Sequence, residues 1–94
     1  MPHEPFLVEV DESTLRRERA KARELRASPW WKRRCSTGVC HYCAKNVGAS
    51  NLTMDHLVPL IRGGRSTKGN VVAACKECNN AKRHQLAIDF QNDR

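Results

Sequence analysis

Two pairs of cysteines stand at a spacing that suits a metal ion. Cys40 and Cys43 form one C-x2-C pair, and Cys75 and Cys78 form a second. Each C-x2-C turn can present two sulfur atoms to one ion, and four thiolates make the closed tetrahedral site that zinc prefers. Because a closed site has no open position for a substrate, the spacing predicts a structural zinc ion. The alternative is a set of free buried thiols.

A second group of polar residues lies between and just after the two cysteine pairs. It consists of Asp55-His56-Leu57-Val58-Pro59, then Gly63-Gly64, then Asn70, and finally Asn79-Asn80-Ala81-Lys82 directly after the last cysteine. This order resembles the HNH endonuclease family, with a DH-x-x-P strand end, a glycine loop, a middle Asn and C-x2-C-N-x-x-K opening a helix. The resemblance covers about residues 40–83.

The resemblance implies a small α+β fold with a ββα-metal (His-Me finger) core. It also implies His56 as the general base, Asp55 and Asn79 as ligands of a catalytic divalent ion, and Asn70 as a brace of the loop that orients His56. These roles suit the residue types, because a neutral imidazole can take a proton from water near pH 7 and hard cations take oxygen ligands. The last letter of the motif is Asn here, which resembles the Mg2+-preferring forms, so we expect Mg2+ or Mn2+.

The two adjacent residues Asp55 and His56 pose a geometric condition. In a regular strand they would point to opposite faces. They can serve one phosphate only if the strand ends or twists there. Of the other histidines, His41 is expected to be exposed inside the first cysteine turn. His84, five residues past Asn79, is expected to lie off the metal-facing side of the helix.

The charge of the chain favours a polyanionic partner. The 94 residues include 17 Lys and Arg against 10 Asp and Glu, a formal net charge of +7. Residues 13–94 hold all 17 bases and 6 of the acids, which gives +11. A small basic domain most simply binds nucleic acid, so we expect DNA, with RNA as an alternative. Phosphate contacts are expected from Arg62, Arg65, Lys82 and Arg83.

The remaining cysteine and the N-terminus indicate the redox setting. Cys35 makes the cysteine count odd, which argues against a disulfide framework, and it is expected to be a spare thiol. The N-terminus has no basic stretch followed by a long apolar run. We therefore expect a cytoplasmic protein with reduced thiols, without a signal peptide or a membrane-spanning segment.

The elements that must position these residues can be read from the sequence pattern. We expect a strand at Phe6, Val8 and Val10, a helix from about Ser13 to Ala27, strands at 52–56 and 70–74, and a helix from the second cysteine pair through about Phe90. Leu86 and Phe90 are expected to pack back on the hairpin. The predicted division is an N-terminal arm with a basic helix, residues 1–34, and a nuclease core, residues 35–94.

The N-terminal helix allows two interpretations. It is thinly apolar, so it could be a solvated helix docked by a narrow stripe, with Trp30 or Trp31 plugging the core. Alternatively, arginines at 16, 19, 23 and 26 recur every three or four residues and could lie along a phosphate backbone.

Three functions remain open at this stage. The first is a metal-dependent endonuclease of low sequence specificity that nicks or cleaves DNA. The second is a non-catalytic four-cysteine zinc module that binds nucleic acid, which would not need Asp55, His56 and Asn79. The third is a protein-interaction zinc domain, which would not need the +11 charge over residues 13–94.

Overall fold

The computed structural model describes residues 9–92. Phe6 and Val8 of the predicted first strand lie outside the described residues, and Val10 belongs to no strand. The helices are α1 (Glu12–Arg26), α2 (Pro29–Cys35), α3 (Lys76–Lys82) and α4 (Ala87–Asn92), and the strands are β1 (Leu52–His56) and β2 (Val71–Cys75). Three short 3-10 helices are η1 (Ala49–Asn51), η2 (Leu60–Arg62) and η3 (Lys68–Asn70).

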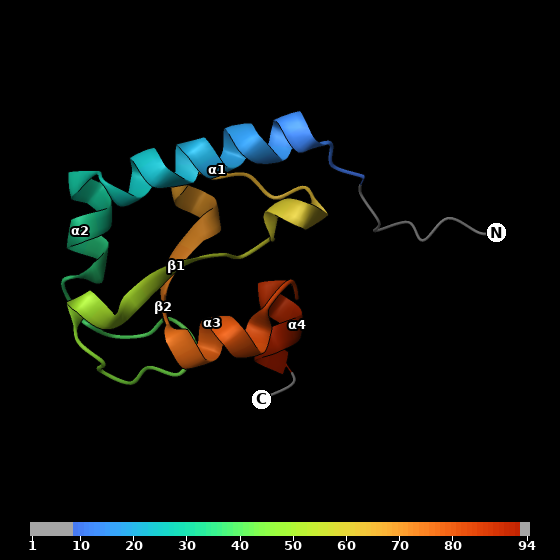
Figure 1. Ribbon diagram of the computed structural model, residues 1–94. Coiled ribbons are helices and arrows are strands. Elements are labelled where there is room, and N and C mark those ends of the chain that lie inside the picture. Colours follow the sequence, from blue (N-terminus) through green and yellow to red (C-terminus); the bar gives the residue numbers. More distant parts are fainter. Residues whose placement is uncertain (1–8, 93–94) are drawn as a thin grey trace.

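An antiparallel hairpin of β1 and β2 forms the centre of the molecule (Figure 1). The register pairs Leu52 with Cys75 at one end and His56 with Val71 at the other. Every residue of β2 is buried, as expected for an apolar strand covered on both faces. Both predicted strands are confirmed, although β2 begins one residue later than expected. The result is the small α+β, ββα-metal architecture, with the glycine loop at the His56 end.

The predicted N-terminal helix is confirmed as α1. Asp11 caps it by accepting a 2.8 Å hydrogen bond from the Thr14 amide. Its buried residues are Glu18 and Ala22, and the helix contacts η2. Figure 1 shows α1 crossing over the loops that join the two strands, while α3 and α4 lie on the other side of the hairpin.

A second helix, α2, follows where the sequence indicated only the end of the first. Ser28 closes α1 and at the same time caps α2 through a hydrogen bond from the Trp31 amide, with Pro29 in the first turn. Proline is favoured there because its missing N–H has no helical partner to lose. Trp31 is buried in the main core cluster, which confirms one of the two tryptophans as a core plug.

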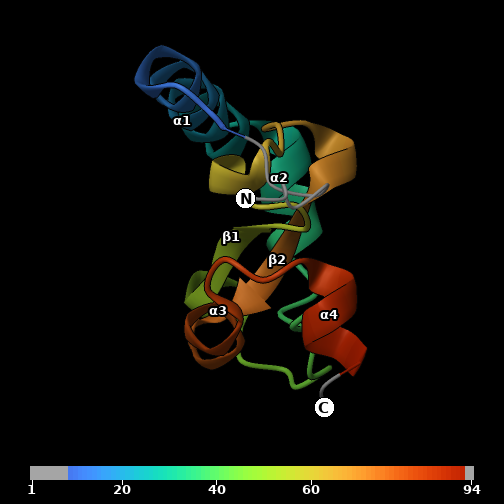
Figure 2. The ribbon, with the colours of Figure 1, turned by 90° about the vertical axis from the view of Figure 1, so that its right-hand side faces the viewer.

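The predicted single helix through Phe90 is wrong, because the chain breaks it between α3 and α4. Arg83 adopts a φ of 50°, outside the helical range, and directs the chain back before α4 begins. Figure 2 shows the two helices as separate elements, with α3 to the left and α4 to the right of the end of β2. Phe90 is buried and meets Tyr42 edge-on at a centroid distance of 5.1 Å, and Leu86 is half-buried. No helix in the described part of the chain could cross a membrane.

Candidate active site and zinc centre

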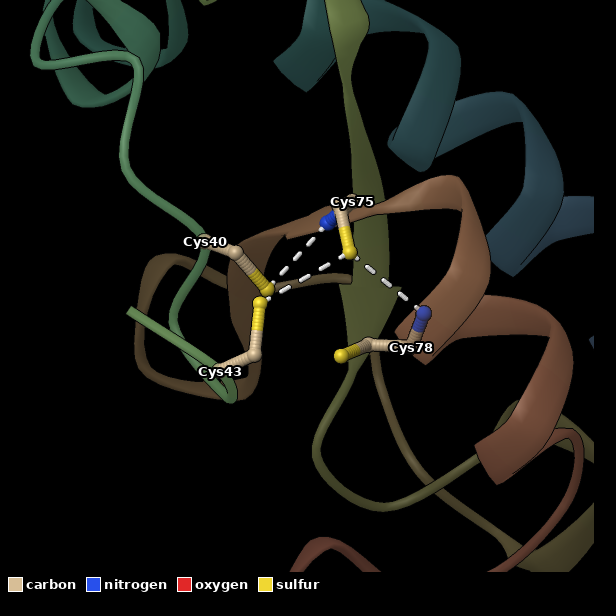
Figure 3. A group of neighbouring side chains, drawn as sticks. All are labelled: Cys40, Cys43, Cys75 and Cys78. Atoms are coloured by element: carbon tan, nitrogen blue, oxygen red, sulfur yellow. Dashed lines mark hydrogen bonds between the residues drawn. The ribbon is translucent and has the colours of Figure 1, made fainter. Parts of the chain in front are cut away.

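The four paired cysteines converge at the Leu52–Cys75 end of the hairpin (Figure 3). Cys40 and Cys43 lie in a turn between the bridged residues 39 and 46, Cys75 ends β2, and Cys78 lies in the first turn of α3. All four sulfur atoms lie within 4.8 Å of one another, and Cys43 Sγ is 3.9 Å from Cys75 Sγ. A tetrahedral zinc ion with Zn–S bonds of about 2.3 Å spaces its sulfurs by roughly 3.8 Å. The donor set and its spacing therefore fit a closed zinc site.

Backbone amides prepare this cluster for a cation. Burial by itself would raise the pKa of Cys40, but backbone N–H groups of Cys43, Cys75 and Tyr42 outweigh it and lower the pKa to about 6. The Cys75 and Tyr42 amides lie 3.3 and 3.4 Å from Cys40 Sγ. The thiolate that zinc requires is thus favoured at neutral pH. Burial raises the pKa of Cys35, which lies outside the cluster as expected.

The other end of the hairpin borders a pocket of about 330 Å3. Asp55, His56 and Asn79, predicted from distant parts of the motif, all line it. β1 ends at His56, so both members of the adjacent pair can border one space. The structure thus meets the geometric condition set by the sequence. Helix α1 supplies Leu15 and Arg19 to another part of the wall.

Asp55 is held by two side chains that the motif does not mark for this task. The Tyr42 hydroxyl donates to Asp55 Oδ2 at 2.5 Å, and Lys82 Nζ lies 3.3 Å from Oδ2 and 3.5 Å from Oδ1. Lys82 is 0% exposed and also donates to the His56 carbonyl at 2.9 Å. Its expected phosphate contact does not agree with this placement. Burial and the bond to Asp55 raise the pKa of Tyr42, so it stays a phenol donor.

The orientation of the Asn79 amide follows from its neighbours. Thr53 Oγ1 gives its own hydrogen to the Ala74 carbonyl at 2.9 Å, so it accepts the 2.8 Å bond from Asn79 Nδ2. The Met54 carbonyl, 3.5 Å from the same nitrogen, can also only accept. Among residues 9–92, no donor bonds to Asn79 Oδ1. An amide that donates inward and leaves its oxygen free has the polarity of a cation ligand.

His56 lies at the pocket with Nε2 3.0 Å from Ser66 Oγ. Burial lowers the pKa of His56; the negative charge of Asp55 opposes this shift and the positive charge of Lys82 reinforces it. The ring is therefore neutral at pH 7 and able to accept a proton.

Asn70 is bonded to the backbone of the loop beside His56. Its Oδ1 accepts from the Val58 amide at 2.9 Å, and its Nδ2 donates to the carbonyls of Val58 and Arg65 at 3.0 and 2.8 Å. The Asn70 carbonyl also accepts from the Leu57 amide at 2.8 Å. These are the bonds that a brace of this loop would make.

The basic residues expected to contact nucleic acid fall in different places. Arg83 lines the pocket, and Arg65 is exposed in the loop. Arg62 is exposed, and its Nε donates to the His84 carbonyl at 2.7 Å. His84 also lines the pocket, contrary to expectation, because the break at Arg83 removes it from the helix on which its position was extrapolated. His41 is exposed, as expected.

Several residues at the site carry no signal in the motif. They are Glu18, Arg19, Tyr42, Thr53 and Ser66. Glu18 and Ser66 are 48 positions apart and meet only through the docking of α1. Tyr42 could have been suspected from the sequence, because it lies between Cys40 and Cys43. A zinc ion bound by these two cysteines would fix the position of the Tyr42 hydroxyl as well.

Comparisons with known proteins agree with this geometry. The family model for HNH endonucleases matches residues 40–93. The CRISPR-associated endonuclease Cas9 of Corynebacterium diphtheriae is 43% identical over 44 residues, which cover 46% of this chain and 4% of that protein. The Cas9 of Actinomyces naeslundii is 39% identical over 45 residues, covering 47% and 4%. The type IV methyl-directed restriction enzyme EcoKMcrA of Escherichia coli is 36% identical over 55 residues, covering 52% and 20%.

The chain therefore spans only a small part of each of these relatives. The family match itself covers more than half of the chain and includes the four clustered cysteines and the three motif residues at the pocket. On these grounds, this chain belongs to the HNH endonuclease family.

Proposed function

We propose that this chain is a metal-dependent endonuclease that hydrolyses DNA phosphodiester bonds with low sequence specificity. The observation that carries the proposal is that Asp55, His56 and Asn79 all border the same pocket. A neutral imidazole, a carboxylate and a free amide oxygen meet there, and a pure binding module needs none of them. Arg19 and Arg83 border the same space and supply positive charge for a phosphate.

Two oxygens are available to hold a catalytic Mg2+ or Mn2+ ion. Asn79 Oδ1 is free among the described residues, and Asp55 Oδ1 has only the long 3.5 Å contact with Lys82. When bound, such an ion neutralises charge on the phosphate and on the departing 3′ oxygen. Tyr42 and Lys82 hold the Asp55 carboxylate in place. Thr53 holds the Asn79 amide in the matching orientation.

His56 supplies the base in the hydrolytic step. A water oxygen forms the new bond to phosphorus while its proton moves to the neutral imidazole. The bond from phosphorus to the 3′ oxygen breaks, which leaves 5′-phosphate and 3′-hydroxyl ends once that oxygen takes a proton from solvent. The lowered pKa of His56 keeps the ring in its accepting form at neutral pH.

The surface charge supports a nucleic acid as substrate. Arg62 and Arg65 are exposed on the loop beside the pocket, so we propose them, with Arg83, as phosphate contacts. Contacts of this kind are independent of base identity and give binding that weakens as salt rises. Low sequence specificity is proposed for the same reason.

A plasmid assay tests the proposal. Purified zinc-loaded protein is incubated with supercoiled DNA and Mg2+, Mn2+ or EDTA, beside His56→Ala and the matched control His41→Ala, whose ring lies outside the pocket. We expect ion-dependent nicking that falls by roughly 10²–10⁴-fold in His56→Ala, because a positioned general base contributes about that much. His41→Ala should match wild type, and all three should hold equal zinc.

The outcomes separate the alternatives. Ion-dependent nicking that persists in His56→Ala would contradict the assignment of the base. Binding of DNA without nicking in any ion would favour the non-catalytic zinc module instead. A parallel reaction with single-stranded RNA decides whether RNA is also cleaved.

A further inference from the structure

A buried chain of hydrogen bonds joins α1 to the ring of His56. The Ser66 amide donates to Glu18 Oε1 at 2.7 Å, and the Ser66 hydroxyl donates to the Glu18 carbonyl at 2.7 Å. Ser66 Oγ also lies 3.0 Å from His56 Nε2. Glu18 is 2% exposed and Ser66 is 7% exposed, so water competes little for these bonds.

The single hydroxyl hydrogen of Ser66 decides the direction of the last bond. A backbone carbonyl can only accept, so the 2.7 Å contact with the Glu18 carbonyl uses that hydrogen. Ser66 Oγ has none left for the ring, and it must therefore accept from His56. The nitrogen that faces Ser66 is Nε2, which makes the neutral ring the Nε2–H tautomer.

We infer that α1 is part of the active site: through Ser66 it holds His56 as the Nε2–H tautomer, with Nδ1 free to accept the proton from water. This inference rests on the proposed function and adds to it two positioning residues, Glu18 and Ser66. The family model matches residues 40–93, and helix α1 precedes this segment. The hydrogen bonds from Glu18 through Ser66 to His56 therefore lie partly outside the matched segment.

The burial of Glu18 shows what fixes α1 in this role. A carboxylate taken from water is costly unless donors replace its hydration. Here Oε1 accepts the Ser66 amide, and Oε2 lies 3.3 Å from Lys21 Nζ. These bonds fix the helix against the loop at the point where the Glu18 carbonyl receives the Ser66 hydroxyl. The next residue, Arg19, borders the pocket, so one turn of α1 both anchors the loop and forms the wall.

The tautomer can be measured without any cleavage. Long-range proton–nitrogen NMR spectra of the zinc-loaded, 15N-labelled chain, recorded without Mg2+ at mildly alkaline pH, distinguish the two ring nitrogens of His56. We expect Nε2 protonated and Nδ1 bare in wild type. Ser66→Ala should lose this preference and become a mixture. Ser66→Thr, which keeps a hydroxyl, should restore it.

Cleavage kinetics give the second readout. We expect Ser66→Ala to lower kcat by roughly 10–100-fold, the usual effect of removing a partner that orients a functional histidine. KM for DNA should be unchanged, because Ser66 is buried and is not among the residues that line the pocket. Ser36→Ala is the matched control: its exposed hydroxyl also donates to a carbonyl, that of Arg33 at 2.6 Å, but lies away from the pocket. It should keep wild-type kcat.

Each outcome bears on the inference separately from the proposed function. A wild-type ring protonated on Nδ1 would overturn the inference, as would wild-type kcat in Ser66→Ala. If wild type fails to cleave DNA at all, the proposed function fails. The NMR spectrum still decides whether His56 is held as the Nε2–H tautomer. If Ser66→Ala does not fold, as zinc content and circular dichroism would reveal, the wild-type spectrum remains decisive.

Discussion

The two ends of the β1–β2 hairpin are held in opposite ways. At the Leu52–Cys75 end, four sulfur atoms gather around one position and fit a zinc ion. At the His56–Val71 end, hydrogen bonds that Ser66 and Asn70 accept, together with a buried ion pair between Lys82 and Asp55, hold the site. The Leu52–Cys75 end would be stabilised by one metal ion bound to four sulfur atoms. The His56–Val71 end is stabilised by several hydrogen bonds and one ion pair.

This difference separates folding from function along one short hairpin. In the proposed function, the end of the hairpin that carries the four cysteines takes no part in the chemistry, so it can be closed and rigid. The His56–Val71 end, called the site end below, borders an open pocket. Residues of α1 and α3 therefore hold its side chains from the side away from the pocket, through hydrogen bonds and an ion pair. Helix α3 connects the two, because Cys75 of the sulfur cluster caps its N-terminus and Lys82 is its last residue. Perturbations at the two ends should therefore differ in kind.

Removal of zinc should have the largest effect. Structural zinc sites of this type contribute roughly 10–16 kcal/mol, more than a small domain can lose and remain folded. We expect a strong chelator to abolish the cooperative thermal transition seen by circular dichroism, and added zinc to restore it. Cys35→Ala is the control, since Cys35 lies outside the cluster and its loss should leave zinc content unchanged. A chelated protein with an unchanged Tm would show that the core suffices without metal.

Lys82→Met should have the next largest effect, and it acts at the site end. It leaves the buried Asp55 carboxylate without its cation and the His56 carbonyl without a donor. Breaking one side of a buried pair typically costs about 3–5 kcal/mol. We expect a loss of that size in urea unfolding of the zinc-loaded protein. The exposed Lys76→Met, on the same helix, should change stability by less than about 0.5 kcal/mol. Equal effects of the two would contradict the burial of Lys82.

The same division explains what the sequence could predict. The cysteine cluster follows from two C-x2-C pairs and the strands from their apolar pattern, and the meeting of Asp55, His56 and Asn79 follows from the resemblance to the HNH family. The bonds that tie the site from behind join distant segments, such as Glu18 with Ser66, and no local pattern marks them. The helix break at Arg83 was missed because neither glycine nor proline stands there. The buried position of Lys82 was missed because a motif lysine beside a phosphate site suggests the phosphate as its partner.

Gly64→Ala should have a smaller effect, confined to the loop at the site end. A Cβ at Gly64 would lie 1.8 Å from the Val58 carbonyl oxygen, which is backbone and cannot move aside. Overpacking of this kind costs about 1–3 kcal/mol. The matched control is Gly69→Ala in the same loop, where a Cβ meets nothing within 4 Å. It should be neutral or raise stability by about 0.4–1 kcal/mol. If both variants melt alike, the close approach at Gly64 is not a constraint.

Arg83→Gly should have the smallest effect on stability, and it should be favourable. Arg83 holds a φ of 50°, a conformation that a side chain disfavours by about 1–2 kcal/mol and glycine adopts freely. Because Arg83 keeps this strain at the edge of the pocket, we expect its side chain to have a role there. We therefore expect Arg83→Gly to raise the Tm slightly, to weaken DNA binding, and to lower the salt slope of binding by about 1.

Ala44 offers a matched control for this last variant. It has a φ of 61° in the first cysteine turn, at the zinc end of the hairpin and away from the pocket. Ala44→Gly should give the same relief of strain with no change in the salt slope. If both variants bind DNA like wild type, the backbone conformation of Arg83 serves only to change the direction of the chain between α3 and α4. If only Arg83→Gly loses affinity for DNA, the positive φ of Arg83 has a role in binding. The disfavoured backbone conformation is then kept because it directs the Arg83 guanidinium toward the substrate.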